Sequence, residues 1–195
     1  MLKFLSHKMT CFFIRKNVIE QSEEETYDYC FEILLSTLLN LFSIIIIAVC
    51  TQTYLSSFLF IVIFMIMRSL SGGYHADTHF RCFLILLFVY SGLILSIKFL
   101  PNIFFISLIF NFISLILYPI LAPVEHYNNP MDKIKKRKLK VKSILASLII
   151  ICASNVMVFF NPTEIIGFTM AYTNFVVVIS CLFSLFKNKL LHNKA

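Results

Sequence analysis

The chain has 195 residues, of which 59% are hydrophobic and only 14% are charged. Soluble domains carry about 25% charged residues, so this sequence has too little charge to cover a water-soluble surface. Its 22 phenylalanines exclude disorder, and its 4 glycines and 5 prolines exclude a collagen-like or low-complexity chain. We therefore predict an integral membrane protein with one domain over residues 1–195.

Residues 1–30 are predicted to form a cytoplasmic segment with two parts. Up to residue 19, apolar residues lie near helical spacing with cations between them. This pattern is typical of an amphipathic helix on the membrane surface, and a loosely ordered basic tail is the alternative. Residues 20–28 are acidic, and we expect them to be solvated.

Six apolar runs follow, and helices are the default for them because lipid cannot satisfy backbone polar groups. The runs cover residues 31–51, 54–67, 83–100, 103–122, 143–161 and 164–186. The second run is short for a spanning helix; it is tilted, re-entrant or extended by residues from Arg68 onward. Asn111, Asn155 and Asn174, like Asn40, are expected to join helix to helix. The fold class is thus all-α and polytopic, with about six transmembrane helices.

The positions of the basic residues predict the orientation in the membrane. All Lys and Arg residues except Lys98 lie before the first run, in 68–81, in 133–142 or after residue 186. Six spans place these four regions on one side, which the positive-inside rule assigns to the cytoplasm. Residues 123–142 are then a basic cytoplasmic loop, and residues 187–195 a cytoplasmic tail. No separate basic domain exists, which argues against a nucleic-acid partner.

Chemistry is concentrated in residues 68–82, between the second and third runs. This stretch contains His75 and Cys82, and a cysteine becomes a nucleophile when a histidine makes its thiolate. In one regular helix the two residues would be about 10.5 Å apart along the axis, so we expect the helix to break between them. The Gly72-Gly73 pair permits a tight turn there.

The next helix is expected to begin just after Asp77 or Thr78, since either residue is a good N-cap. Cys82 then lies in the first turns of the third span, where the helix dipole favours a thiolate. Simple packing of the cysteine and solvation of the histidine are the alternative. A zinc site of His75, His79 and Cys82 with a water molecule is a further alternative, but the spacing is loose and no fourth protein ligand is obvious. We expect no metal and no cofactor.

The pattern Arg68-x3-Gly72-Gly73-x-His75-Ala76-x5-Cys82 resembles the signature of AgrB, the accessory gene regulator protein B family. The chain length, the apolar layout and the Ala122-Pro123-Val124 run are also similar to that family. The resemblance implies a membrane cysteine endopeptidase of quorum sensing that processes an AgrD-type propeptide. It implies that Cys82 is the nucleophile, that His75 is the general base, and that a cyclic thiolactone or lactone peptide results.

The neighbouring residues have supporting interpretations. Gly72 and Gly73 let the backbone approach the substrate and offer N–H groups to an oxyanion. Arg68 either pairs with a substrate carboxylate or anchors the end of the span. Asp77 orients His75 or, as we favour, caps the helix, and His79 is a bystander.

A cluster of cations is the candidate binding site for the acidic tail of the propeptide. It comprises Lys133, Lys135, Lys136, Arg137 and Lys138. The favoured alternative is that these residues set the topology and contact lipid headgroups. A homodimer is compatible with the sequence but not indicated by it. The other functional classes are a peptide exporter or permease without chemistry, and a membrane scaffold, which leaves the Gly-Gly-His segment unexplained.

Overall fold

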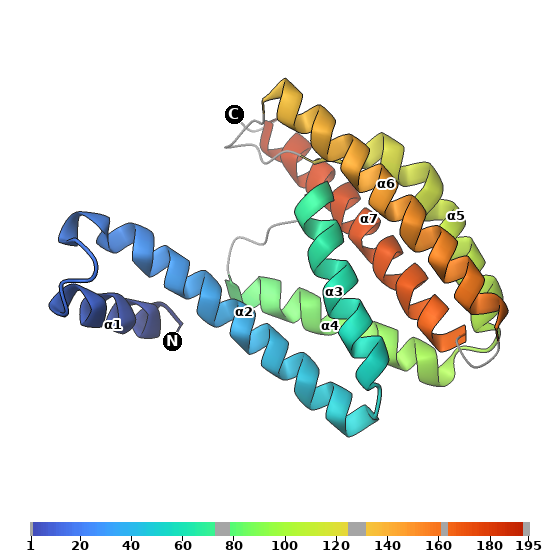
Figure 1. Ribbon diagram of the computed structural model, residues 1–195, viewed down its shortest axis with the longest axis horizontal. Helices are drawn as coiled ribbons and strands as arrows, with labels where there is room; N and C mark the ends of the chain where they lie inside the picture. Colours follow the sequence, from blue (N-terminus) through green and yellow to red (C-terminus); the bar gives the residue numbers. More distant parts are fainter. Residues whose placement is uncertain (1, 73–78, 125–131, 161–163, 193–195) are drawn as a thin grey trace. The chain divides into compact units, whose positions relative to one another are not determined.

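The computed structural model describes residues 2–72, 79–124, 132–160 and 164–192, and these residues are almost entirely helical (Figure 1). The helices are α1 (Leu2–Arg15), the 3-10 turn η1 (Gln21–Glu23), α2 (Glu24–Thr51), α3 (Tyr54–Ser71), α4 (His79–Phe99), α5 (Ile103–Leu121), α6 (Lys133–Phe159) and α7 (Glu164–His192). No strand occurs among the described residues. Helices α2 to α7 are long and apolar enough to cross a membrane. The all-α, multi-pass prediction is confirmed, as is a helix near the N-terminus.

Several helices extend beyond the predicted apolar runs. The prediction of a loop over residues 123–142 is wrong from Lys133 onward, because the basic stretch forms the first turns of α6. Lys, Arg and Leu are good helix formers, and no glycine or proline interrupts this stretch. Similarly, α7 continues to His192 instead of ending in a tail at residue 187. At the other end of the chain, α2 begins in the acidic segment at Glu24, where carboxylates suit the helix dipole.

The short second apolar run, residues 54–67, is part of a longer helix. Helix α3 includes Arg68 and ends at Ser71, which gives it 18 residues. At a rise of about 1.5 Å per residue the helix is about 27 Å long, close to the roughly 30 Å of a bilayer core. The predicted loop 68–82 is correspondingly shorter, because residues 68–71 belong to α3 and residues 79–82 to α4.

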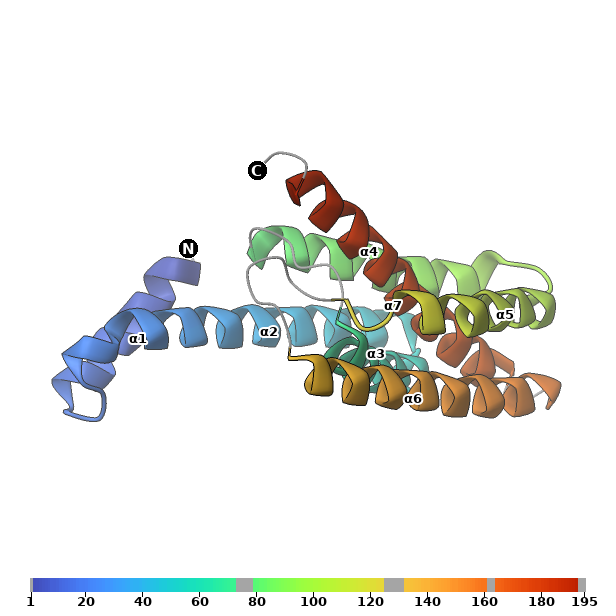
Figure 2. The same ribbon diagram turned by 90° about the horizontal axis from the view of Figure 1, so that it is seen from above.

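The chain divides into two compact units: Met1–Cys50 with Ala76–Phe88, and Thr51–His75 with Val89–Ala195. In the first unit, α1 folds back against the start of α2 (Figures 1 and 2). The Phe13 ring stacks on the Phe31 ring, with centroids 5.5 Å apart and planes within 11°. Ser6 and Thr10 are buried on the same helix. The two helices therefore form a packed hairpin.

The second unit is organised around α7, which packs against α3, α5 and α6. Its core includes Met67 from α3, Tyr118 from α5 and Val177 from α7, all essentially buried. These helices carry apolar side chains on their inner faces, and α3 ends at Ser71 with Gly72 as its C-cap. The end of α3 leads directly into the segment expected to carry chemistry.

Buried asparagines join the helices of this unit. Asn111 on α5 donates to the Ser154 hydroxyl at 3.1 Å and to the Asn155 side-chain oxygen at 2.7 Å on α6. Asn174 on α7 donates to the Ser147 hydroxyl on α6 at 3.0 Å. The expected helix-joining role is confirmed for these three asparagines. Such bonds contribute about 0.6–2 kcal/mol each between membrane helices.

Candidate active site

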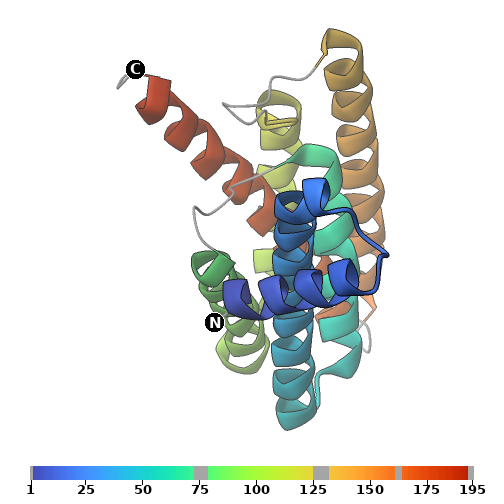
Figure 3. The ribbon, with the colours of Figure 1, turned by 90° about the vertical axis from the view of Figure 1, so that its left-hand side faces the viewer.

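The end of α3 is joined to the segment that follows α5. Ser71 is the last residue of α3, and its carbonyl accepts a hydrogen bond from the Val124 N–H at 3.0 Å. The Ser71 hydroxyl donates to the Met67 carbonyl at 2.6 Å. We call this contact, formed by Ser71 and Gly72 on one side and residues 122–124 on the other, the seam (Figure 3). It lies where the chain leaves α3 for residues 73–78.

Gly72 occupies a backbone conformation that suits glycine, with φ 72° and ψ −149°. A Cβ atom added here would lie 2.6 Å from the Val124 carbonyl oxygen. The Gly72 N–H donates to the Arg68 carbonyl at 3.1 Å, so this geometry does not support Gly72 as an oxyanion donor. Position 72 requires glycine because the Val124 backbone at the seam leaves no room for a side chain. Gly73 lies outside the described residues.

Two further side chains lie at the seam. The buried Cys181 thiol of α7 is directed at the Ser71 carbonyl at 3.7 Å and at the Gly72 carbonyl at 4.0 Å. The half-buried Arg68 guanidinium lies over the Phe64 ring, 5.6 Å from its centroid. This position is compatible with either interpretation of Arg68. Nothing in the sequence distinguishes Cys181 from the other cysteines that lie within apolar runs.

Cys82 lies in the first turn of α4. The described part of α4 runs from His79, and Cys82 is its fourth residue. Its side chain is half-buried. Cys82 is therefore near the N-terminal end of the described part of α4, as expected, while the predicted capping residues Asp77 and Thr78 lie outside the described residues. His75 and Asp77 lie outside the described residues, so their approach to Cys82 remains a prediction.

The cations Lys133, Lys135, Lys136, Arg137 and Lys138 are exposed and lie in the first turns of α6. Helix N-termini carry partial positive charge, so cations are unfavourable there and anions are favoured. Asp132 directly precedes the helix without capping it through its side chain. The start of α6 is therefore an exposed region of positive charge, and binding of a propeptide tail there stays a prediction.

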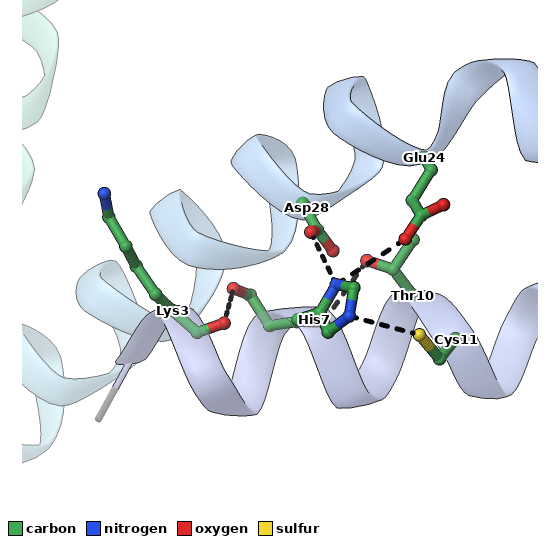
Figure 4. Close-up of polar contacts among 7 residues, drawn as sticks. Lys3, His7, Thr10, Cys11, Glu24 and Asp28 are labelled. Atoms are coloured by element: carbon green, nitrogen blue, oxygen red, sulfur yellow. Dashed lines mark hydrogen bonds and ion pairs between the residues drawn. The ribbon is translucent and has the colours of Figure 1, made fainter.

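A second polar cluster lies between α1 and α2, and the sequence analysis missed it (Figure 4). The His7 Nε2 atom is 3.6 Å from the Cys11 Sγ, and His7 Nδ1 is 2.9 Å from an Asp28 carboxylate oxygen. Glu24 approaches the same Nδ1 at 3.7 Å. The hydrogen bond to Asp28, together with its negative charge, raises the pKa of His7 above its ordinary value.

This cluster corrects the expectation that the whole acidic segment is solvated. Glu20, Glu23 and Glu25 are exposed, whereas Glu24 and Asp28 are half-buried against α1. The sequence does contain two pairs of polar residues that are four positions apart: His7 with Cys11 on α1, and Glu24 with Asp28 on α2. Residues four apart share a helical face.

The family model of accessory gene regulator B (AgrB) matches residues 6–188. The chain belongs to this family. Membership places it in the agr quorum-sensing system, in which the propeptide AgrD is processed. The matched region of this AgrB-family chain includes the seam, Cys82 and the basic start of α6. No curated protein and no solved structure matches the chain.

Proposed function

We propose that the chain is a membrane cysteine endopeptidase that removes the C-terminal tail of an AgrD-type propeptide. Cys82 is the nucleophile and His75 the general base. The observation that carries the proposal is the position of Cys82 in the first turn of α4, just after the Arg68–His75 pattern, in a chain that matches AgrB over nearly its whole length. The first turn of a helix favours negative charge, such as that of a thiolate.

The first half of the reaction forms a thioester. His75 takes the proton from the Cys82 thiol, and the sulfur attacks the carbonyl carbon of the scissile peptide bond. The carbon–nitrogen bond then breaks, and the departing amine takes the proton from the imidazolium of His75. The tail leaves with a new amino terminus, and the signal portion remains attached to Cys82 as an acyl-enzyme.

The second half of the reaction releases a ring. An internal thiol or hydroxyl of the bound peptide attacks the thioester carbonyl, and Cys82 leaves as the thiol after taking up that proton. The product is a cyclic thiolactone or lactone, and the energy of the cleaved amide is retained in part by the thioester. Water must be excluded, because it would otherwise hydrolyse the acyl-enzyme. The apolar residues of α4 around Cys82 support such exclusion.

The exposed cations at the start of α6 bind the acidic tail in this proposal. Carboxylates would offset the unfavourable charge of lysines at a helix N-terminus. The competing interpretation is contact with anionic lipid headgroups. Both termini, residues 68–82 and the start of α6 lie in the cytoplasm in this proposal, because Lys and Arg are concentrated in these regions.

The proposal is tested by co-expressing the chain with a candidate propeptide encoded beside its gene and analysing the peptides by mass spectrometry. Wild-type protein is expected to give the free tail and the ring, which is lighter than the linear product by one water. The Cys82→Ala and His75→Ala chains are expected to leave the propeptide intact. Cys152→Ala is the matched control, since Cys152 is an exposed cysteine on α6, and it should process normally.

A Cys82→Ala chain that still trims the propeptide would refute the nucleophile assignment. A thiol-alkylating reagent gives an independent check. Processing should stop when Cys82 is modified and continue in a chain whose only alkylated residue is Cys152. Export of an already trimmed peptide, unaffected by alkylation, would instead favour the exporter or permease.

A further inference from the structure

The hairpin of α1 and α2 brings four potential metal ligands together. His7 and Cys11 are four residues apart on α1, and Glu24 and Asp28 are four residues apart on α2. Each pair therefore presents both side chains on one helical face. The aromatic stack of Phe13 on Phe31 fixes how the two helices are aligned, so the two pairs face each other (Figure 4).

The potential ligand atoms of this cluster lie close enough together to hold one metal ion. One ligand atom each from His7, Cys11 and Glu24 lies within 4.8 Å of the others. About a half of the His7 side chain and a third of the Glu24 side chain are exposed, with values of 53% and 33%. A small ion can therefore reach the cluster from solvent.

The donor set indicates the kind of ion. Imidazole nitrogen, thiolate sulfur and carboxylate oxygen are the ligands of Zn²⁺, which accepts three protein ligands with a water molecule in the fourth position. A thiolate and an imidazole disfavour Mg²⁺ and Ca²⁺, which prefer oxygen. Two ligands four residues apart on one helix is a common zinc spacing.

Asp28 completes the arrangement from the other side of the ring. Its carboxylate accepts the hydrogen bond from His7 Nδ1 at 2.9 Å, which leaves Nε2 facing the Cys11 sulfur at 3.6 Å. Metal-bound histidines typically donate their second ring N–H to such a carboxylate, and the bond fixes the tautomer and the ring orientation. The second carboxylate oxygen of Asp28 is buried and has no hydrogen-bond partner among the described atoms.

We propose that His7, Cys11 and Glu24 form a binding site for a zinc-class divalent ion, with Asp28 positioning His7. The ion joins α1 to α2 and closes the chain between Cys11 and Glu24 into a loop. Thiolate coordination requires release of the Cys11 proton on binding. The site is separate from Cys82 in sequence and in ligands, and it does not depend on the proposed peptidase function.

The test uses the full chain in detergent, freed of metal with a chelator and carrying no polyhistidine tag. Zn²⁺ affinity is measured by competition with a chromophoric chelator, and Co²⁺ serves as a spectroscopic probe for a sulfur-to-metal charge-transfer band. Wild-type protein is expected to bind one Zn²⁺ or one Co²⁺ ion, and the Co²⁺ form should show the charge-transfer band. Cys11→Ala should abolish the band, and His7→Ala and Glu24→Gln should each weaken binding at least tenfold. Asp28→Asn should weaken it about 10- to 100-fold.

Matched controls keep the result specific. Cys30→Ala and Glu25→Gln change exposed residues of the same helix outside the cluster, and they should bind as wild type does. Cys82→Ala should also bind normally, which separates this site from one built on His75 and His79. Far-ultraviolet circular dichroism checks that each variant remains helical.

A second measurement follows the thiol itself. Bound Zn²⁺ should slow alkylation of Cys11 at least tenfold while leaving Cys30 unchanged, as read by mass spectrometry. Binding that survives in the Cys11→Ala, His7→Ala double variant would overturn the proposal. So would equal alkylation of Cys11 with and without Zn²⁺, or a zinc site that disappears in Cys82→Ala.

Discussion

Replacing Gly72 with alanine tests the seam most directly. Its φ of 72° and ψ of −149° lie near a region that essentially only glycine adopts, and another residue held there costs about 1–3 kcal/mol. In addition, the new Cβ would lie 2.6 Å from the Val124 carbonyl oxygen. That oxygen belongs to the backbone, so it cannot rotate away as a side chain would.

The two costs add to about 3 kcal/mol if the overlap resembles an overpacked core. At about 1.4 kcal/mol per tenfold change, this strain lowers the population of the intact seam by about a hundredfold. The strain is released by separating Val124 from Ser71, because that contact is one hydrogen bond, whereas unfolding α3 would expose a buried helix. We therefore expect processing to fall by up to about a hundredfold while helical content stays unchanged.

The assay is propeptide processing by mass spectrometry, with circular dichroism and thermal unfolding in detergent on the same preparations. Gly72→Asn should be as damaging as alanine: asparagine tolerates the left-handed helical region, but this ψ lies outside it and the Cβ overlap remains. Gly92→Ala is the comparison variant: its Cβ would meet the Tyr172 hydroxyl at 2.7 Å, a side-chain end instead of backbone, so it should cost about 1 kcal/mol of stability through the Tyr172–Val89 bond and still process normally. Normal processing and unfolding temperature in Gly72→Ala would refute the reasoning.

Other perturbations have smaller expected effects. Asn111→Ala removes two hydrogen bonds between α5 and α6 and should destabilise the protein by about 1–3 kcal/mol in thermal unfolding. An unchanged unfolding temperature would show that these bonds are unimportant for stability. Tyr172→Phe removes the bond from its hydroxyl to the Val89 carbonyl at 2.9 Å and should cost about 1 kcal/mol by the same measurement. The double variant Lys135→Glu, Lys138→Glu should slow propeptide processing at low salt. The effect should shrink as the salt concentration rises, because screening weakens attraction between surface charges. Unchanged processing at low salt would favour the lipid interpretation. Cys181→Ser keeps a donor to the Ser71 carbonyl and should process better than Cys181→Ala, and equal rates would show that this contact is dispensable.

The six spans were predictable because the bilayer leaves an apolar run only one regular structure with satisfied backbone groups. The helix ends were less predictable. The basic residues after Asp132 give no hydropathy signal, although their helix propensity extends α6 to Lys133. The same applies to Arg68, a charged residue that nevertheless lies within α3.

The candidate site was predictable where the signal is local. The apolar stretch after residue 82 predicted the third span and hence placed Cys82 near the N-terminal end of α4. The reason for Gly72 was not predictable, because its neighbour Val124 is distant in sequence and follows another helix. His7 and Asp28 were missed similarly, since spacing reveals a shared face on one helix but not which helix lies opposite.

The seam also limits how parts of such proteins can be exchanged. A graft of residues 71–78 from another family member would bring its own residues 71 and 72 but meet a foreign backbone at position 124. Chimeras intended to recognise a different propeptide should therefore transfer residues 122–124 together with that loop, as one matched pair of segments.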